Sequence, residues 1–338
     1  MTASLVRRAA LAAAAVLVAP AMASCSLLNP PDLVVYNAQH EELITEIVPL
    51  FEEKTGLDVE LRNGKDLEMA NQIVAEGEES PADVFLTENS PAMSIVDNAG
   101  LFAPVSEEAL APIPEQYVPS SKNWTGILAR STVAMYNTDA LTAEDMPESI
   151  LDFADPEWKG RVGFSPTGAD FQAIVSAVLA TEGEEATAEW LAGLKENGVV
   201  LQNNLVVLQS VNAGDVDAGI AYHYYWYRDQ AEAGENSSSS ALHFFGDQDP
   251  GAFLSVSGAG VLASSEHAEN AQQFVEFLTS TDGQQAMADS YALEYPLNPE
   301  ASLGDEVKPF DELEPPVIDI ATLNGPQVTE LMTEAGLL

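Results

Sequence analysis

The chain has 338 residues, 46% of them hydrophobic, and 54 acidic against 12 basic residues give it a formal net charge of −42. That charge excludes nucleic acid as a partner, because phosphates would be repelled, while the hydrophobic content opposes disorder. The acidic residues indicate either a solvated surface that stays soluble in salty surroundings, where salt screens the repulsion, or, alternatively, a fold that attracts cations.

The first residues resemble an export signal. Arg7 and Arg8 precede the short apolar run 9–18, which cannot span a bilayer as a stable helix. Small residues then lead to Cys25, the only cysteine of the chain, as at a lipoprotein processing site. We therefore predict a signal peptide and a lipid on Cys25, with a buried free cysteine as the alternative. A disulfide within the chain is impossible, and no later apolar run is long enough to span a membrane.

Hydrophobic periodicity predicts strands alternating with helices. The first expected elements are a strand over 33–36, a helix over 41–55 that ends before Gly56, a strand over 57–61, a helix over 67–76 and a strand over 83–86. They are followed by a strand over 133–136, helices over 150–153, 171–180 and 186–197, a strand over 219–222, a loop over 237–240, a strand over 253–262 and helices over 268–278 and 283–290. This alternation implies βαβ units and a parallel sheet.

The run from Tyr222 to Tyr227 gathers four tyrosines, a histidine and a tryptophan. Aromatic clusters are usually core. Successive side chains of a strand point to opposite faces, however, so Tyr224 and Tyr225 can reach one target only where the strand gives way to a turn or a helix start. Strand ends that open onto a cleft are where α/β proteins place ligands. A phenol binds a hard cation only as phenolate, and a trivalent metal can lower its pKa from the free value of about 10, so the pair favours ferric iron over zinc or calcium.

Five segments in order resemble the ferric-iron-binding proteins of bacterial iron transporters: residues 35–42, 80–89, 224–226, 249–252 and 294–299. The resemblance extends from about residue 32 to the end of the chain. It implies an α/β, two-lobed periplasmic-binding-protein fold of type II, in which two strand crossings form the hinge and the ligand cleft lies between the lobes. The expected parts are a signal peptide over 1–24, a lipidated tether over 25–31, one lobe from 32–130 and 255–305, and a second lobe from 131–254 and 306–338.

By this resemblance the metal ligands are His40, Glu88, Tyr224 and Tyr225. Two phenolates and one carboxylate balance the charge of Fe³⁺, and hard oxygen ligands with one imidazole suit that ion. Without the resemblance, His40 could equally be a surface histidine capping the next helix, and Glu88 a charge at a helix N-terminus. Four ligands leave an octahedral ion two positions, which water and a synergistic anion, carbonate or phosphate, fill in the family.

The surroundings of that anion depart from the family pattern. The family loop reads like Pro-Thr-Ser-Gly-Ala, with backbone amides at a helix start, whereas residues 166–170 read Pro-Thr-Gly-Ala-Asp. Asp170 could repel an anion, take its coordination position, or cap the helix and face away. Arg130 could pair with the site carboxylate or an anion, or form an ordinary surface salt bridge. The candidates for anion contact or extra ligation are Ser165, Thr167, Gly168, Ala169, Asp170, Asn204, Tyr222, Asn89 and Arg130, while His223 matches no family ligand and is expected to be structural.

The resemblance implies an extracytoplasmic, lipid-anchored and monomeric binding protein that captures Fe³⁺ in its cleft and delivers it to an ABC permease with a separate ATPase. A binding protein of the same fold for an organic or anionic solute, such as thiamine or a polyamine, is the alternative, since fold does not fix the ligand. A metal-dependent hydrolase is disfavoured, because the sequence has no His-Glu-x-x-His motif, phosphate loop or nucleophile elbow.

Overall fold

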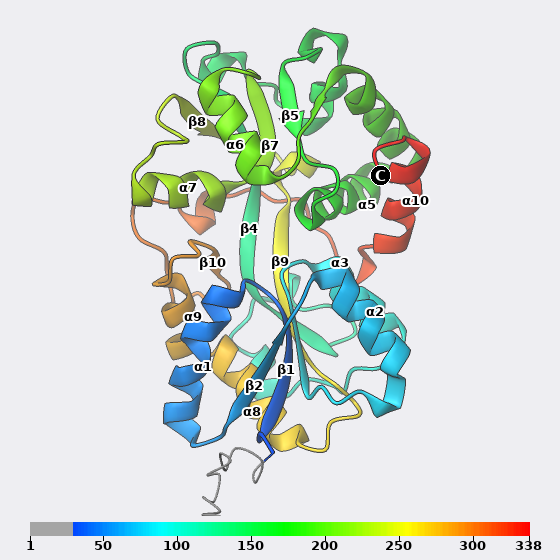
Figure 1. Ribbon diagram of the computed structural model, residues 1–338, viewed down its shortest axis with the longest axis vertical. Coiled ribbons are helices and arrows are strands. Elements are labelled where there is room, and N and C mark those ends of the chain that lie inside the picture. Colours follow the sequence, from blue (N-terminus) through cyan, green and yellow to red (C-terminus); the bar gives the residue numbers. More distant parts are fainter. Residues whose placement is uncertain (1–29) are drawn as a thin grey trace, which may run out of the picture. The chain divides into compact units, whose positions relative to one another are not determined.

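The computed structural model describes residues 30–338 (Figure 1). The predicted signal peptide and Cys25 therefore lie outside the described residues. The first sheet has the order β2-β1-β3-β9-β4, with β10 also paired to β4. The parallel part, as expected from the βαβ pattern, contains β1 (Leu33–Ala38), β2 (Val59–Asn63) and β3 (Val84–Thr87). The sheet is nevertheless mixed, because β9 (Leu254–Val261), β4 (Trp124–Asn137) and β10 (Tyr295–Pro296) join it in antiparallel pairs.

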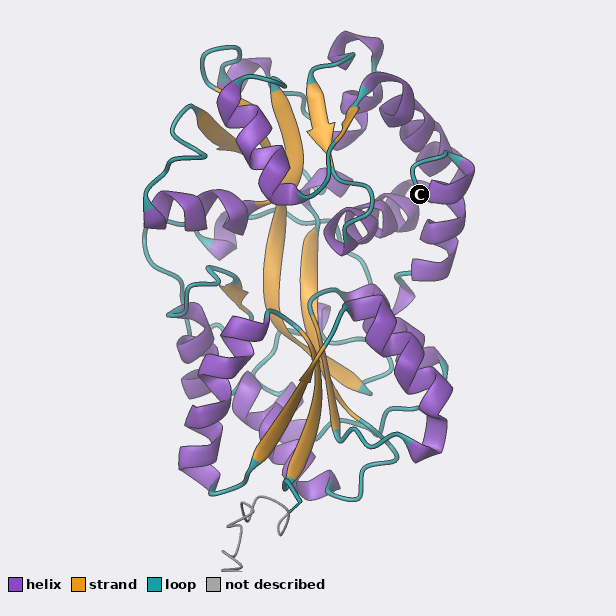
Figure 2. Ribbon diagram, viewed as in Figure 1, coloured by secondary structure: helices purple, strands orange, loops and turns teal. Residues whose placement is uncertain are grey.

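Helices flank both faces of this sheet (Figure 2). They are α1 (Glu41–Thr55), α2 (Asp66–Glu76), α3 (Ser90–Asn98), α8 (Ala268–Thr279) and α9 (Thr281–Ala288), with the short α4 (Glu107–Leu110) nearby. Helix α1 has the predicted bounds and buries one apolar stripe that includes Ile44, Ile47 and Phe51. It ends at Gly56, whose φ of 77° is the left-handed conformation that glycine adopts at low cost.

The second sheet has the order β6-β5-β7-β4, with β8 also paired to β4. Its strands are β5 (Val162–Phe164), β6 (Val199–Val200), β7 (Ala218–Tyr222) and β8 (Ser240–His243). Its helices are α5 (Ala169–Asn197), α6 (Asn204–Ala213), α7 (His223–Glu232) and α10 (Gly325–Glu334). A non-helical Gly183 breaks α5, so the two helices expected in this region are confirmed, while the helix expected over 150–153 is a short 3₁₀ turn.

Strand β4 belongs to both sheets and connects them. It pairs with β9 from Trp124 to Ser131 and with β7 from Thr132 to Tyr136. The change of partner occurs where Ser131 lies opposite Leu254, at the start of β9. The chain thus passes between the sheets on β4 and back on β9, as expected. A third passage through residues 303–324 leads to α10, which packs against α5; periodicity did not predict it, because the segment has only two short 3₁₀ turns.

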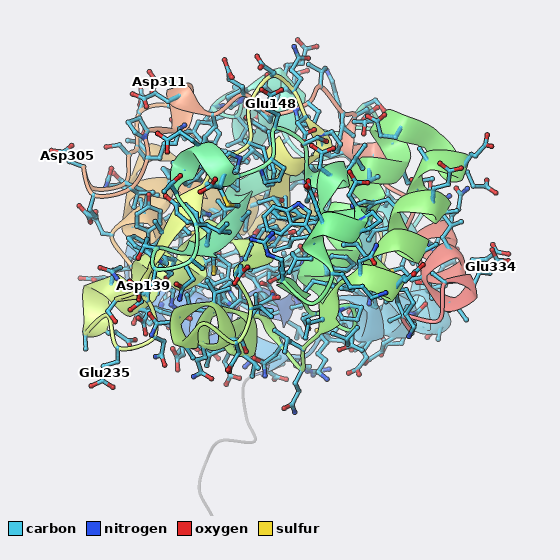
Figure 3. The ribbon with its side chains drawn as sticks, turned by 90° about the horizontal axis from the view of Figure 1, so that it is seen from above. Asp139, Glu148, Glu235, Asp305, Asp311 and Glu334 are labelled. Atoms are coloured by element: carbon cyan, nitrogen blue, oxygen red, sulfur yellow. The ribbon has the colours of Figure 1, made fainter. Side chains whose placement is uncertain are left out.

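Acidic side chains project from the surface into solvent, including Asp139, Glu148, Glu235 and Glu334 (Figure 3). This agrees with the interpretation of the acidic residues as a solvated surface. Among residues 30–338, no helix is both long and apolar enough to cross a membrane.

Candidate metal centre

The tyrosine pair lies where a strand ends and a helix begins. Strand β7 ends at Tyr222 and α7 begins at His223, which confirms the break expected in this run. The rings of Tyr224 and Tyr225 stack with their centroids 4.2 Å apart and their planes at 28°. Tyr224 is fully buried, and within the described part of the chain its hydroxyl has no hydrogen-bond partner. The two phenols can therefore face one target.

His40 and Glu88 approach the pair from the first sheet. They follow β1 and β3, which are parallel neighbours, so both side chains lie at the same sheet edge. His40 Nε2 is 3.6 Å from Glu88 Oε1, and the His40 ring lies 5.5 Å from the ring of Tyr224. His40 precedes α1, but its side chain does not cap that helix, and Glu88 contacts Arg130 rather than the start of α3. The structure thus brings together the four residues predicted as ligands.

Three of the four, His40, Glu88 and Tyr225, line a cleft of about 490 Å³, and the fully buried Tyr224 lies behind Tyr225. Other residues that line the cleft come from both sheets: Lys65, Asp66, Ser165, Thr167, Gly168, Ala169, Asp170 and Asn204 are among them. Within residues 30–338, no group of three His, Cys, Asp or Glu side chains could hold a metal ion by itself. A metal centre here therefore depends on the phenols. Burial raises the pKa of Tyr224 and of Tyr225 well above 10, so a metal must displace the proton from each hydroxyl.

Asp170 faces the cleft. It lies in the first turn of α5, but the residue that caps the helix is Gly168, and no side chain makes the cap. Its Oδ2 accepts hydrogen bonds from Asn204 Nδ2 at 2.7 Å and from the Tyr225 hydroxyl at 3.1 Å. Burial, with a contribution from Glu88, raises the pKa of Asp170 to about 7. The alternative in which Asp170 caps the helix and faces away is therefore wrong.

The remaining loop candidates lie on the same side of the cleft. Ser165, Thr167, Gly168 and Ala169 all line it beside Asp170. The Ser165 hydroxyl is buried without a hydrogen-bond partner among the described residues. A buried hydroxyl normally has a partner, so Ser165 is available to a ligand or water in the cleft.

Arg130 and Glu294 are buried neighbours of opposite charge behind His40 and Glu88. The Arg130 side chain is 0% exposed, and its Nη1 lies 2.8 Å from Glu88 Oε1, so the surface salt bridge considered for it is wrong. The equally buried Glu294 places Oε1 3.2 Å from His40 Nε2 and Oε2 3.7 Å from Arg130 Nε. Burial opposes charge on each group, but the pKa of Glu294 is lowered by Arg130 and His40, and the pKa of Arg130 is raised by Glu294 and Glu88. Burial also lowers the pKa of His40, but Glu294 and Glu88 outweigh it and raise that pKa overall.

Tyr222 and Asn89 lie behind the cleft and do not line it. The Tyr222 hydroxyl donates to the backbone oxygen of Asp170 at 3.2 Å and lies 3.4 Å from Asn89 Oδ1. Asn89 Oδ1 also accepts from Ser255 at 2.8 Å. Burial raises the pKa of Tyr222 well above 10. Tyr222 and Asn89 thus contact each other and the backbone of Asp170 behind the cleft.

His223 connects β4, α7 and the loop before β10. Its Nδ1 accepts the Ser131 N–H at 3.1 Å, so Nε2 carries the proton and donates to the Leu293 carbonyl at 3.0 Å. The ring stacks on Tyr295 with centroids 4.5 Å apart. Burial lowers its pKa to about 4, which keeps the ring neutral, and its role is structural.

Sequence reasoning missed two buried carboxylates. Glu294 entered only as part of the segment 294–299, and Asp66 was not identified at all. Asp66 accepts hydrogen bonds from the Glu88 backbone N–H at 2.9 Å and from Asn89 Nδ2 at 3.0 Å, and thereby fixes the loop after β3. Burial and the charge of Glu88 raise the pKa of Asp66 to about 7. No pattern in the sequence identifies either residue, because both reach the site through long-range contacts.

Comparison with known proteins identifies the group to which this arrangement belongs. Residues 79–313 match the family described as bacterial extracellular solute-binding protein. The Fe(3+)-binding periplasmic protein of Serratia marcescens is 52% identical over 306 residues, which cover 90% of each chain. The major ferric iron-binding protein of Neisseria meningitidis serogroup A is 37% identical over 98% of each chain.

Solved structures of proteins with this fold support the same grouping. The iron-bound HitA of Pseudomonas aeruginosa has a TM-score of 0.85 and 41% identity, and the match covers 91% of this chain and all of that one. The two-lobed type II binding-protein fold expected from the sequence is thereby confirmed. The chain belongs to the bacterial extracellular solute-binding proteins, within the group formed by the periplasmic ferric-iron-binding proteins.

Proposed function

We propose that this protein captures Fe³⁺ outside the cytoplasm and delivers it to an ABC permease with its ATPase. The observation that carries the proposal is the stacked pair Tyr224 and Tyr225, which lies beside His40 and Glu88 at one end of the strands: Tyr225 lines the same cleft as both, and the ring of Tyr224 is 5.5 Å from that of His40. Two phenolates and a carboxylate neutralise a trivalent ion, and oxygen-rich ligands with one imidazole select a hard cation. The relatives named above carry ferric-iron binding in their names. The family consists of solute-binding proteins, and we propose no catalytic role.

Asp170 is the proposed fifth ligand, in the position that an anion takes in the family. Its carboxylate already touches the hydroxyl of Tyr225, and Asn204 fixes its orientation. A negative side chain in this place also disfavours an added anion by charge repulsion. The alternative is a carbonate or phosphate on the α5 amides and the free hydroxyl of Ser165, since a helix start attracts anions.

We propose that residues 32–130 and 255–305 form one lobe, and residues 131–254 and 306–338 the other. The change of pairing partner along β4 after Ser131 supports this division. The ligands then come from both lobes, His40 and Glu88 from one and Asp170, Tyr224 and Tyr225 from the other, so metal binding favours closure of the cleft. We further propose that the protein acts as a monomer held at the membrane by a lipid on Cys25.

The competing function is that of a binding protein with the same fold whose ligand is an organic or anionic solute. The cleft of about 490 Å³ has room for a small solute, but its lining includes Asp66, Glu88 and Asp170 against a single Lys65. Such a lining suits a cation better than an anion.

Metal analysis with a visible spectrum tests the proposal. Purified protein loaded with Fe³⁺ should bind one equivalent and show a phenolate-to-iron charge-transfer band, and Tyr224→Phe or Tyr225→Phe should weaken or abolish that band. Tyr227→Phe is the matched control, because Tyr227 lies outside the cleft and its hydroxyl contacts the Lys308 backbone. A colourless ferric complex at neutral pH would refute the ligand assignment, and tight binding of thiamine or a polyamine without iron would favour the competing function.

A further inference from the structure

Two of the proposed coordinating atoms are held by side chains that are not ligands. Glu88 Oε1 lies 2.8 Å from Arg130 Nη1, and His40 Nε2 lies 3.2 Å from Glu294 Oε1. These contacts have ion-pair distances, although His40 Nε2, Glu294 Oε1 and Arg130 Nη1 make no hydrogen bond of good geometry among the described residues. A metal bound by His40 Nε2 and Glu88 Oε1 must displace both contacts, because a coordinating atom cannot also face the group that now occupies that position.

The two side chains that hold these atoms are themselves neighbours. Arg130 Nε is 3.7 Å from Glu294 Oε2, and both side chains are 0% exposed. An unpaired charge buried at such a position is strongly destabilising. If Glu88 and His40 turned to a metal, Arg130 and Glu294 would each lose a partner, and a small approach would pair them with each other.

We propose that Arg130 and Glu294 are positioning residues that exchange partners when the metal binds. Before binding, Arg130 pairs with Glu88 and Glu294 pairs with His40. After binding, His40 and Glu88 coordinate the metal and Arg130 pairs with Glu294. The inference rests on the proposed function and deepens it, since it explains how the ligands are held ready without leaving a buried charge uncompensated in either arrangement.

The surroundings of Glu294 favour the exchange. Gln39 Nε2 and Ser257 Oγ each lie 3.4 Å from Glu294 Oε2, so neutral donors hold the carboxylate in place. The guanidinium of Arg130 is likewise anchored, with Nη2 3.4 Å from Asn89 Oδ1 and 3.3 Å from Ser255 Oγ. The present separation exceeds a charge-assisted hydrogen bond by only about 1 Å, so a small approach completes the pair.

A crystal structure of the iron-loaded protein tests the geometry. We expect Arg130 to contact Glu294 at about 2.9 Å and Glu88 Oε1 to lie more than about 4 Å from the guanidinium, beyond ion-pair distance. A loaded structure in which Arg130 still holds Glu88 Oε1 and Glu294 still holds His40 Nε2 would overturn the exchange.

A double-mutant cycle tests its energetic consequence. Glu294→Gln should weaken iron binding at least about tenfold, because the buried Arg130 then has no partner of opposite charge in the loaded protein. In the Arg130→Gln background the same substitution should cost less than about threefold. Arg130→Met serves if Arg130→Gln folds poorly, since it also removes the charge while filling the buried space. Glu42→Gln, which removes an exposed carboxylate from the first turn of α1, is the matched charge control and should change affinity less than about threefold. Equal losses for Glu294→Gln in both backgrounds would overturn the inference.

Unfolding measurements on metal-free protein distinguish a failure of this inference from a failure of the proposed function. In chelator-stripped protein, Glu88→Gln and Arg130→Gln should be less than additive in their effects on unfolding, because they remove two halves of one contact. Additive effects would overturn the inference even if the protein binds iron. If the wild type binds no iron, the function fails and the exchange fails with it, whereas non-additivity in the stripped protein would still establish the Glu88–Arg130 contact.

Discussion

Replacement of His223 by leucine tests how the tyrosine pair is held. His223 satisfies two buried backbone groups, the Ser131 N–H and the Leu293 carbonyl, and its ring stacks on Tyr295. Leucine can satisfy neither group. Each buried group left without a partner costs about 1–3 kcal/mol, and the lost stack adds about 1 kcal/mol. Burial of the leucine side chain offsets part of this, so we expect His223→Leu to lower the free energy of unfolding by about 3 kcal/mol at pH 7.

The stability that His223→Leu loses relative to the wild type should become smaller as the pH falls. The pKa of His223 is lowered from 6.5 to about 4, so its neutral form is the one that stabilises the fold. That stability is fully present above pH 6.5 and is lost as the pH falls towards 4, while leucine does not titrate. The difference between wild type and variant should therefore be smaller by about 2 kcal/mol at pH 5 than at pH 7.

Urea unfolding of chelator-stripped protein at a series of pH values measures both effects. His267→Leu is the control, because the His267 side chain is 45% exposed, and we expect it to change stability by less than about 1 kcal/mol. A loss below about 1 kcal/mol for His223→Leu at pH 7, or a difference from wild type that stays constant between pH 7 and pH 5, would contradict the hydrogen-bond assignment.

The remaining predictions concern the metal. Because burial raises the pKa of Tyr224 and Tyr225 well above 10, iron binding must displace two protons. The apparent iron affinity should therefore rise at least about hundredfold per pH unit between pH 5 and 7. Competition against a chelator with known protonation constants measures this rise, and a rise below about tenfold per pH unit would argue against two phenolate ligands. Iron affinity of the wild type should change less than about tenfold, roughly 1.4 kcal/mol, when carbonate and phosphate are removed from the buffer. Asp170→Asn should weaken binding and make it depend on added anion, whereas a strong anion requirement in the wild type would show that the anion site persists.

Local patterns determined many of the elements and singled out the tyrosine pair, whereas the full set of predicted ligands came from the resemblance to the ferric-iron-binding proteins. The apolar stripe of α1 and the glycine after it gave that helix its correct bounds, since spacing along a helix is a property of neighbouring residues. The break before Tyr224 and Tyr225 followed from the same kind of argument, because two adjacent phenols cannot share a target on a strand. These inferences needed no knowledge of what lies across the fold.

Only the tertiary structure decided how the site is charged and supported. Arg130 and Glu294 are 164 positions apart in the sequence, yet both are fully buried behind the same two ligands. The orientation of Asp170 towards the cleft depended on Asn204 in another helix, and a helix-capping role was equally compatible with its sequence position. Burial and long-range pairing set whether a charged side chain is a surface group or a functional one, and neither is encoded in the residues beside it.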